Sequence, residues 1–254
     1  MSGISNAIAV VAGGAHSCAL KVDGTARCWG SNASRQIGAG TTSAIQFSPI
    51  LVRTNGMTAL AAGRAHSCAR RADGSAVCWG AGDFGQIGNG VIQSFVALPT
   101  TAGNGGFTSA IAGDDFTCAP RPGADVQCWG RNDRGQLGSP VLGNQPSLVT
   151  MPVGAVHAAG GQLHTCVMVA SGAVLCAGET ANGRIGNGVT ALGTQPAPQL
   201  VQGLSSVAAL SAGQAHACAV RGSGQVFCWG LGASHQLGNG STADRAAATA
   251  VAGF

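Results

Sequence analysis

One arrangement of residues recurs five times along this chain of 254 residues and constrains its fold more than any other feature. A cysteine is followed after nine residues by a second cysteine, and after nine more by a glycine. Successive first cysteines are 50, 50, 48 and 52 positions apart. Such a period is typical of repeat architectures, in which each repeat is one supersecondary unit stacked on its neighbours. The pairs are Cys18/Cys28, Cys68/Cys78, Cys118/Cys128, Cys166/Cys176 and Cys218/Cys228.

The residues between the paired cysteines predict a β-hairpin. In the first repeat, Asp23-Gly24 lies between two segments that are compatible with β-structure, a strong hairpin signal. A three-residue loop at positions 22–24 places Cys18 directly opposite Cys28. Cross-strand partners of this kind lie about 4.5 Å apart at Cα, which a disulfide tolerates. We therefore expect each repeat to contain its own disulfide.

Each repeat also contains material for two further strands. An apolar run, Ala7–Ala12 in the first repeat, precedes the hairpin, and a proline-containing segment, Pro49–Val52, follows a glycine-rich loop. Proline cannot donate to a β-ladder, so this last segment is expected at an outer edge. Four strands in about 50 residues are typical of a propeller blade. We predict an all-β, five-bladed β-propeller forming a single domain over 1–254, with repeats at approximately 4–53, 54–103, 104–153, 154–203 and 204–254.

The two ends of the chain continue the repeat. The stretch Gly3–Gly13 matches Gly203–Gly213, and residues 246–253 match the segments that precede such stretches inside the chain. Propellers can build one blade from both termini, which leaves no open sheet edge. We therefore expect a ring closed by joining N- and C-terminal segments in one blade. An open arc completed by another chain is the alternative.

Composition favours an exported, folded protein. Charged residues are only 9% and apolar residues 45%, so the chain can bury a core. Ten paired cysteines indicate an oxidising compartment, extracellular, periplasmic or at the cell surface. Without a C-x-x-C pair a metal role is disfavoured. No apolar stretch of membrane-spanning length occurs, and Met1–Asn6 shows no signal peptide, so we expect a mature portion or an excised domain. The net charge of +4 comes from scattered arginines, which disfavours nucleic-acid binding.

A histidine precedes the first cysteine by two positions in four repeats, and Phe116 replaces it in the third. These residues would form a ring on one face, either as a ligand site or as repeated packing residues that bond to a neighbouring backbone. Phenylalanine fills space but cannot ligate, so Phe116 favours packing. Together with the residues around the histidines they form our candidate binding face: His16, Arg64, His66, Asp114, Asp115, Phe116, Gln162, His164, Gln214 and His216.

Catalytic motifs are absent from the sequence. It contains no G-x-S-x-G, no H-E-x-x-H and no phosphate-binding loop. Asp114 and Asp115 are adjacent, so in a strand their carboxylates point to opposite faces and form no acid/base pair. The tryptophans beside the second cysteines, such as Trp79, are interpreted as blade core. We predict no catalytic residue, no metal site and no cofactor.

Two runs of the sequence resemble a known family. Ala12-Gly-Gly-Ala-His-Ser-Cys-Ala-Leu20 and Cys78-Trp-Gly-Ala-Gly-Asp-Phe-Gly-Gln-Ile-Gly-Asn-Gly90 are similar to repeats of the regulator of chromosome condensation family. The resemblance covers essentially the whole chain and implies a β-propeller, usually of seven blades. Members include a nucleotide-exchange factor for a small nuclear GTPase and a secreted bacterial inhibitor of β-lactamases. The paired cysteines resemble the exported bacterial branch. Five repeats instead of seven, and the lack of a long insertion, weaken a transfer of exchange activity.

These observations predict an exported, non-enzymatic scaffold that recognises a protein partner through loops on one face. The loops differ in length and composition, which favours one partner over many identical pockets. A carbohydrate-binding, lectin-like propeller is the alternative, and a guanine-nucleotide exchange factor is a third reading that the cysteines disfavour. The variable loops are Thr41–Ser48, Val91–Leu98, Pro140–Pro146 and Val189–Pro196.

Overall fold

The computed structural model describes residues 4–103, 105–123 and 125–253. Three parts of the sequence expectations lie outside the described residues: the two ends of the single domain, the start of the matching stretch at Gly3, and the first position of the third repeat. Within the described ranges the chain contains twenty β-strands and one short 3₁₀ helix, Ala181–Gly183. No helix among these residues has the length and apolarity that crossing a membrane requires.

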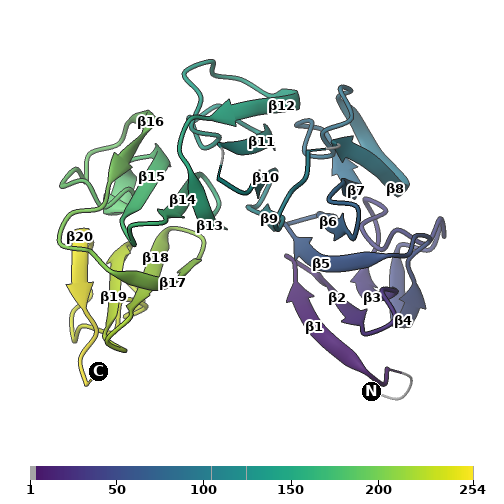
Figure 1. Cartoon of the computed structure of the whole chain (residues 1–254), viewed down its shortest axis with the longest axis horizontal. Coiled ribbons are helices and arrows are strands. Elements are labelled where there is room, and N and C mark those ends of the chain that lie inside the picture. Colours follow the sequence, from purple (N-terminus) through teal and green to yellow (C-terminus); the bar gives the residue numbers. More distant parts are fainter. Residues whose placement is uncertain (1–3, 104, 124, 254) are drawn as a thin grey trace. The chain divides into compact units, whose positions relative to one another are not determined.

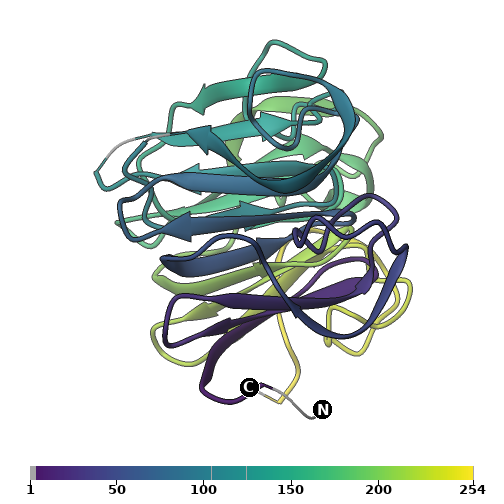
Figure 2. The same cartoon turned by 90° about the vertical axis from the view of Figure 1, so that its right-hand side faces the viewer.

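The strands form five antiparallel sheets of four strands each, so the all-β prediction of five blades is confirmed. Each sheet occupies a narrow range of the chain's colours, in Figure 1 and again in the rotated view of Figure 2. The chain divides into two compact units. Unit 1 comprises Met1–Pro122, Gln127–Arg131 and Asn144–Val149, and unit 2 comprises Gly123–Val126, Asn132–Gly143 and Thr150–Phe254.

Unit 1 contains the first two sheets and most of the third. The first sheet is β1 (Ala7–Ala12), β2 (His16–Lys21), β3 (Ala26–Ser31) and β4 (Ile45–Leu51). The second is β5 (Met57–Ala62), β6 (His66–Arg71), β7 (Ala76–Gly82) and β8 (Gln93–Gly103). The third is β9 (Ile111–Ala112), β10 (Phe116–Pro120), β11 (Val126–Gly130) and β12 (Gln145–Met151).

Unit 2 contains the fourth and fifth sheets. The fourth is β13 (Ala155–Gly160), β14 (His164–Val169), β15 (Val174–Glu179) and β16 (Thr194–Leu200). The fifth is β17 (Val207–Ala212), β18 (His216–Arg221), β19 (Val226–Gly230) and β20 (Arg245–Ala250).

The sheets correct one expectation about the chain ends. Strand β1 pairs with β2 in the first sheet, and β20 pairs with β19 in the fifth. Every described sheet is therefore built from consecutive strands, and none is the expected blade shared by both termini. The reason lies in the repeat itself, which begins with its inner strand and ends with its outer strand, so each stretch of chain completes its own sheet.

The hairpin prediction is confirmed in the first repeat and its counterparts. Cys18 pairs with Cys28 in the β2–β3 register, with Cα atoms 4.1 Å apart. The turn residue Gly24 has φ of 75°, a conformation that glycine adopts without strain. All five predicted pairs are disulfides: Cys18–Cys28, Cys68–Cys78, Cys118–Cys128, Cys166–Cys176 and Cys218–Cys228.

Apolar side chains from neighbouring sheets form the core within each unit. One cluster joins the first two sheets through residues such as Leu20 and Leu60, a second includes Cys78 and Trp129, and a third lies in unit 2 around Trp229. The single Ile or Leu of each glycine-rich loop is fully buried. These residues are Ile37, Ile87, Leu137, Ile185 and Leu237.

Candidate functional site

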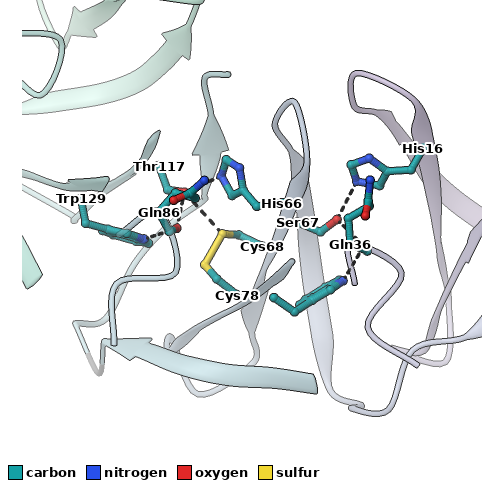
Figure 3. Close-up of a disulfide and its surroundings, with 10 residues drawn as sticks. His16, Gln36, His66, Ser67, Cys68, Cys78, Gln86, Thr117 and Trp129 are labelled. Atoms are coloured by element: carbon teal, nitrogen blue, oxygen red, sulfur yellow. Dashed lines mark hydrogen bonds between the residues drawn. A yellow bond between two sulfur atoms is a disulfide. The ribbon is translucent and has the colours of Figure 1, made fainter. Parts of the chain in front are cut away.

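The repeated histidines link neighbouring sheets in unit 1. His16 Nε2 lies 2.8 Å from Ser67 Oγ on β6, and His66 Nε2 lies 2.9 Å from Thr117 Oγ1 on β10 (Figure 3). Both imidazoles are buried. Burial lowers the pKa of His16 from 6.5 to about 4 and that of His66 to about 3, so both rings are neutral near pH 7. The two rings are packed between sheets, and their Nε2 atoms contact side-chain hydroxyl groups where the packing interpretation expected backbone groups.

A glycine three residues before each histidine makes room for its ring. At Gly63, a Cβ atom would lie 2.2 Å from His66 Cε1 and 2.5 Å from the carbonyl oxygen of Gly113. No side chain can occupy that space unless the ring moves. The glycine and the histidine of the repeat therefore act as one packing unit.

Carbonyl groups of the glycine-rich loops accept hydrogen bonds from side chains of the next sheet. The carbonyl of Gln36 accepts from Trp79 Nε1 at 2.8 Å and from Ser67 Oγ at 3.0 Å (Figure 3). The carbonyl of Gln86 accepts from Trp129 Nε1 at 3.0 Å and from Thr117 Oγ1 at 3.3 Å. Histidine, hydroxyl group and loop carbonyl thus form a continuous path of hydrogen bonds, a hydroxyl relay, between neighbouring sheets. Trp79, Trp129 and Trp229 are fully buried, as expected of core residues, whereas Trp29 is only partly buried.

The sequence-predicted face consequently contains two kinds of residue. Arg64 and Gln214 are exposed, and Asp114, Gln162 and His216 are partly exposed. The remaining members lie in the interior and cannot touch a partner in this conformation: His16, His66, Asp115, Phe116 and His164. Backbone hydrogen bonds bring two pairs together, Arg64 with Asp114 in unit 1 and Gln162 with Gln214 in unit 2.

A charged network in unit 1 surrounds Asp115. Arg64 donates from Nη2 and Nε to Asp115 Oδ1, at 2.7 and 3.1 Å, and Arg131 Nη1 lies 3.7 Å from Oδ2. The Asp115 side chain is 6% exposed, whereas that of Arg64 is 55% exposed. The Arg131 guanidinium also lies over the Phe84 ring, 5.2 Å from its centroid. The buried carboxylate therefore orients two arginines that reach the surface.

Unit 2 contains a second carboxylate flanked by arginines. Arg184 Nη1 lies 2.9 Å from Glu179 Oε2, and Arg134 Nε lies 3.7 Å from Oε1. Both Glu179 and Arg184 are buried. Sequence reasoning missed Arg131, Glu179 and the two arginines that flank Glu179. A signal existed, because Arg131 and Glu179 occupy the same repeat position, three residues after the second cysteine, where uncharged residues stand in the other repeats.

The variable loops connect the third and fourth strands of each sheet, and the structure shortens them. The end of each predicted loop belongs to the outer strand, which begins at Ile45 in β4, Gln93 in β8, Gln145 in β12 and Thr194 in β16. The alternating pattern of these outer strands is weak, so the sequence did not reveal their start. Asn32 holds the first loop by donating from Nδ2 to the carbonyl of Ser43 at 2.7 Å. Phe47, 91% exposed, follows on β4.

The described residues contain no group of three or more His, Cys, Asp or Glu side chains that could hold a metal ion. The rings of His16 and His66 contact hydroxyl groups, and the cysteines are joined as disulfides. What the arrangement offers is a rigid scaffold with a few ordered charged and polar groups at its surface.

Comparison with known proteins agrees with this geometry. Models of the regulator of chromosome condensation (RCC1) repeat match residues 7–36, 57–86, 207–236 and 125–168, together just over half of the chain. The human Regulator of chromosome condensation is 36% identical over 85 residues, which are 34% of this chain and 20% of that protein. The human E3 ubiquitin-protein ligase HERC2 is 38% identical over 88 residues, 33% of this chain and 2% of the ligase. The chain thus spans a fifth or less of these relatives.

Solved structures share the fold. Yeast RCC1 (Prp20), bound to Kap60, superposes with a TM-score of 0.83 at 22% identity, covering 96% of this chain and 61% of Prp20. Another structure of Prp20p from Saccharomyces cerevisiae, described with its binding properties to Gsp1p and histones, has a TM-score of 0.81. The ectodomain of the Arabidopsis thaliana receptor kinase ACR4 has a TM-score of 0.56 at 21% identity, covering 89% and 64% of the two chains. Repeat frame, sheet topology and family matches agree, and the chain belongs to the RCC1 repeat family of β-propeller proteins.

Proposed function

We propose that this chain is an exported, non-enzymatic scaffold that recognises a protein partner through exposed loops on one face. Two observations on relatives support a protein partner: yeast Prp20 is seen bound to Kap60, and its binding to Gsp1p and histones is described. The rigid fold and its disulfides suit recognition, because loops on a rigid scaffold lose little entropy on binding.

The Arg64–Asp115–Arg131 network is the observation that carries this proposal. Arginine is enriched at binding hot spots, and an arginine already held by a carboxylate loses less rotamer freedom when a partner binds. Arg64 is held through two donors to a buried oxygen, yet more than half of its side chain is exposed. Asp115 is buried, so its ion pairs also serve the fold, but Arg64 presents more than half of its side chain to a partner.

Within the predicted face we assign separate roles to the two kinds of residue. Arg64, Asp114, Gln162 and Gln214 would contact the partner, since they reach the surface. The buried histidines and Phe116 would set the spacing of the sheets that present them.

Export is supported by the cysteines. Five disulfides are consistent with an oxidising environment, and disulfides are rare in the cytosol. The similar fold of a plant receptor ectodomain supports the same location. We propose an extracellular, periplasmic or cell-surface site of action.

A binding experiment with matched variants tests the proposal. The immobilised protein is incubated with the native secretome of its source, alongside Arg64→Ala and Lys21→Ala. Lys21 also forms an ion pair, with Asp23 at 2.8 Å, but in a hairpin turn, so its variant controls for charge. We expect wild type and Lys21→Ala to retain the same protein, and Arg64→Ala to retain at least tenfold less.

Three outcomes would overturn it. Retention that free sugars abolish, together with signals on a glycan array, would establish the carbohydrate-binding alternative. Accelerated nucleotide release from a small GTPase would establish an exchange factor. Equal retention by all three proteins would remove Arg64 from the binding site.

A further inference from the structure

The hydroxyl relay between neighbouring sheets is complete at two contacts of unit 1. Ser67 Oγ contacts His16 Nε2 and donates to the Gln36 carbonyl. Thr117 Oγ1 does the same for His66 and the Gln86 carbonyl. In both cases the hydroxyl group accepts from a neutral imidazole N–H and donates its own hydrogen to a loop carbonyl, so that Nε2 and the hydroxyl group are both paired, whereas Nδ1 of His16 and of His66 is buried without a partner.

The corresponding contact between the fourth and fifth sheets lacks the hydroxyl. The residue in the place of Ser67 and Thr117 is Ala217, which is fully buried. His164 is also fully buried, and neither of its ring nitrogens has a hydrogen bond of good geometry. Only the tryptophan bond remains, from Trp229 Nε1 to the Arg184 carbonyl, and at 3.2 Å it is longer than its counterparts. A buried polar group without a partner destabilises the folded state, and this free energy is recovered when the group reaches water.

His164 has little freedom to find another partner. A Cβ at Gly161 would lie 2.2 Å from His164 Cε1, so the ring is packed tightly against the glycine. His164 pairs in register with Gly178, and a Cβ there would lie 2.7 Å from its Cα. The ring is therefore held in place by packing while its polar atoms stay unsatisfied.

Two cationic or titratable side chains near His164 oppose a positive charge on its ring, and a smaller effect of the His216 backbone favours one. Arg184, on the loop after β15, and His216, on β18, both act on the ring electrostatically. Glu179 and Asp244 bear on Arg184, and Arg134 lies near Glu179. Burial first, then Arg184 and His216, lower the pKa of His164 to about 3. Burial also lowers the pKa of His216.

We propose that the contact between the fourth and fifth sheets is an acid-sensitive junction, which opens locally below neutral pH because water then gives His164 the proton and the partners that Ala217 does not supply. The His164 ring is neutral in the closed junction and protonated in the open one. Opening therefore takes up a proton, and the open fraction rises as pH falls from 6.5 toward 3, by up to tenfold per pH unit for one histidine.

Hydrogen exchange measured by mass spectrometry tests this junction directly. Protection factors, corrected for intrinsic exchange at each pH, are compared between residues 207–221, at the junction, and residues 57–71, which carry the complete relay. From pH 7.0 to 4.5 we expect protection of 207–221 in the wild type to fall by roughly 50- to 100-fold, and to lie below that of 57–71 at both pH values because the junction lacks the hydroxyl group.

Three variants separate the missing hydroxyl from the histidine itself. Ala217→Ser supplies the hydroxyl, and we expect it to raise protection of 207–221 by about fivefold at both pH values, as one net hydrogen bond would. His164→Phe copies the residue found at Phe116, and we expect it to reduce the acid effect at least tenfold, with His216 contributing the remainder. Ser67→Ala creates the same defect in unit 1 and should lower protection of 57–71.

The proposal is overturned by any of three results. These are protection of 207–221 that stays within threefold between the two pH values, protection at pH 4.5 that Ala217→Ser leaves unchanged, and a full acid effect in His164→Phe. If Ala217→Ser fails to fold, the wild-type and His164→Phe comparisons still decide the matter.

Discussion

Buried imidazoles act in this protein as neutral spacers that carry hydrogen bonds. His66 is fully buried and hydrogen-bonded to Thr117 across to the next sheet. In the third repeat Phe116 occupies the same position, also fully buried, which shows that the space can be filled without a bond. Where histidine is used, the fold acquires a group that is neutral inside and basic once exposed. This couples stability to pH.

Stability should fall with acid over a defined window. Because the folded-state pKa of His66 is about 3 and the unfolded value is 6.5, the unfolded chain binds the extra proton below pH 6.5. The free energy of unfolding should decrease from pH 6.5 toward 4 in urea denaturation series. His66→Phe should reduce that slope by up to about 1.4 kcal/mol per pH unit and cost about 1 kcal/mol at pH 7 through the lost bond. Identical slopes in both proteins would contradict this account.

The repeated structural element of this protein is a four-stranded sheet whose central hairpin is cross-linked by a disulfide. The disulfide joins the two middle strands, and the glycine-rich loop places one aliphatic side chain and one carbonyl against the next sheet. Each sheet therefore contains both its own cross-link and the means to bind its neighbour.

Removing one disulfide should weaken the element without changing its topology. Cys68→Ser with Cys78→Ser reopens a loop of about ten residues, worth roughly 2.5–3 kcal/mol in the chain-entropy model. We expect a lower melting temperature in calorimetry and an unchanged far-UV circular dichroism spectrum. Ten free thiols in a mass spectrum of the non-reduced wild type would contradict the premise.

Two loop glycines, one between β7 and β8 and the other between β8 and β9, should differ in how well they tolerate a side chain. Gly88 has φ of 76° and a Cβ there would lie 2.7 Å from Trp129 Cδ1, whereas Gly106 has φ of 62° with nothing within 4 Å. Gly106→Ala should cost about 1–2 kcal/mol from backbone conformation alone. Gly88→Ala should cost about 1–3 kcal/mol more through overpacking against Trp129. Equal losses of unfolding free energy in urea denaturation would show that the Trp129 side chain moves to make room.

At the scale of the whole molecule, we propose that the five sheets form a single domain over residues 1–254. Repeat proteins gain stability from contacts between neighbouring repeats, so adjacent sheets support one another. Within unit 1 this support is visible in the core clusters shared by successive sheets.

Calorimetry tests the single domain. We expect one cooperative transition whose calorimetric and van't Hoff enthalpies agree. Two separable transitions, each retained by one half of the chain after limited proteolysis, would instead indicate two domains.

The local features of the fold could be read from the sequence alone. The hairpins, disulfides and buried Ile or Leu depend on residues at most about twenty positions apart, and at that range spacing and turn chemistry determine geometry. The start of the outer strands was missed because their alternation of apolar and polar residues is weak. The five-fold period was sufficient for the all-β fold, but not for the assignment of chain ends to blades.

The site depended on tertiary structure. His66 meets Thr117, and Arg64 meets Asp115, across 51 positions in each case. The sequence placed Arg64, His66 and Asp115 on one candidate face, but which side chains turn inward depends on how one sheet packs on the next. Burial therefore separated Asp115 from Asp114 and the histidines from Arg64. Interactions between sheets join side chains whose directions no local pattern encodes, so only the packed structure could decide between scaffold and surface.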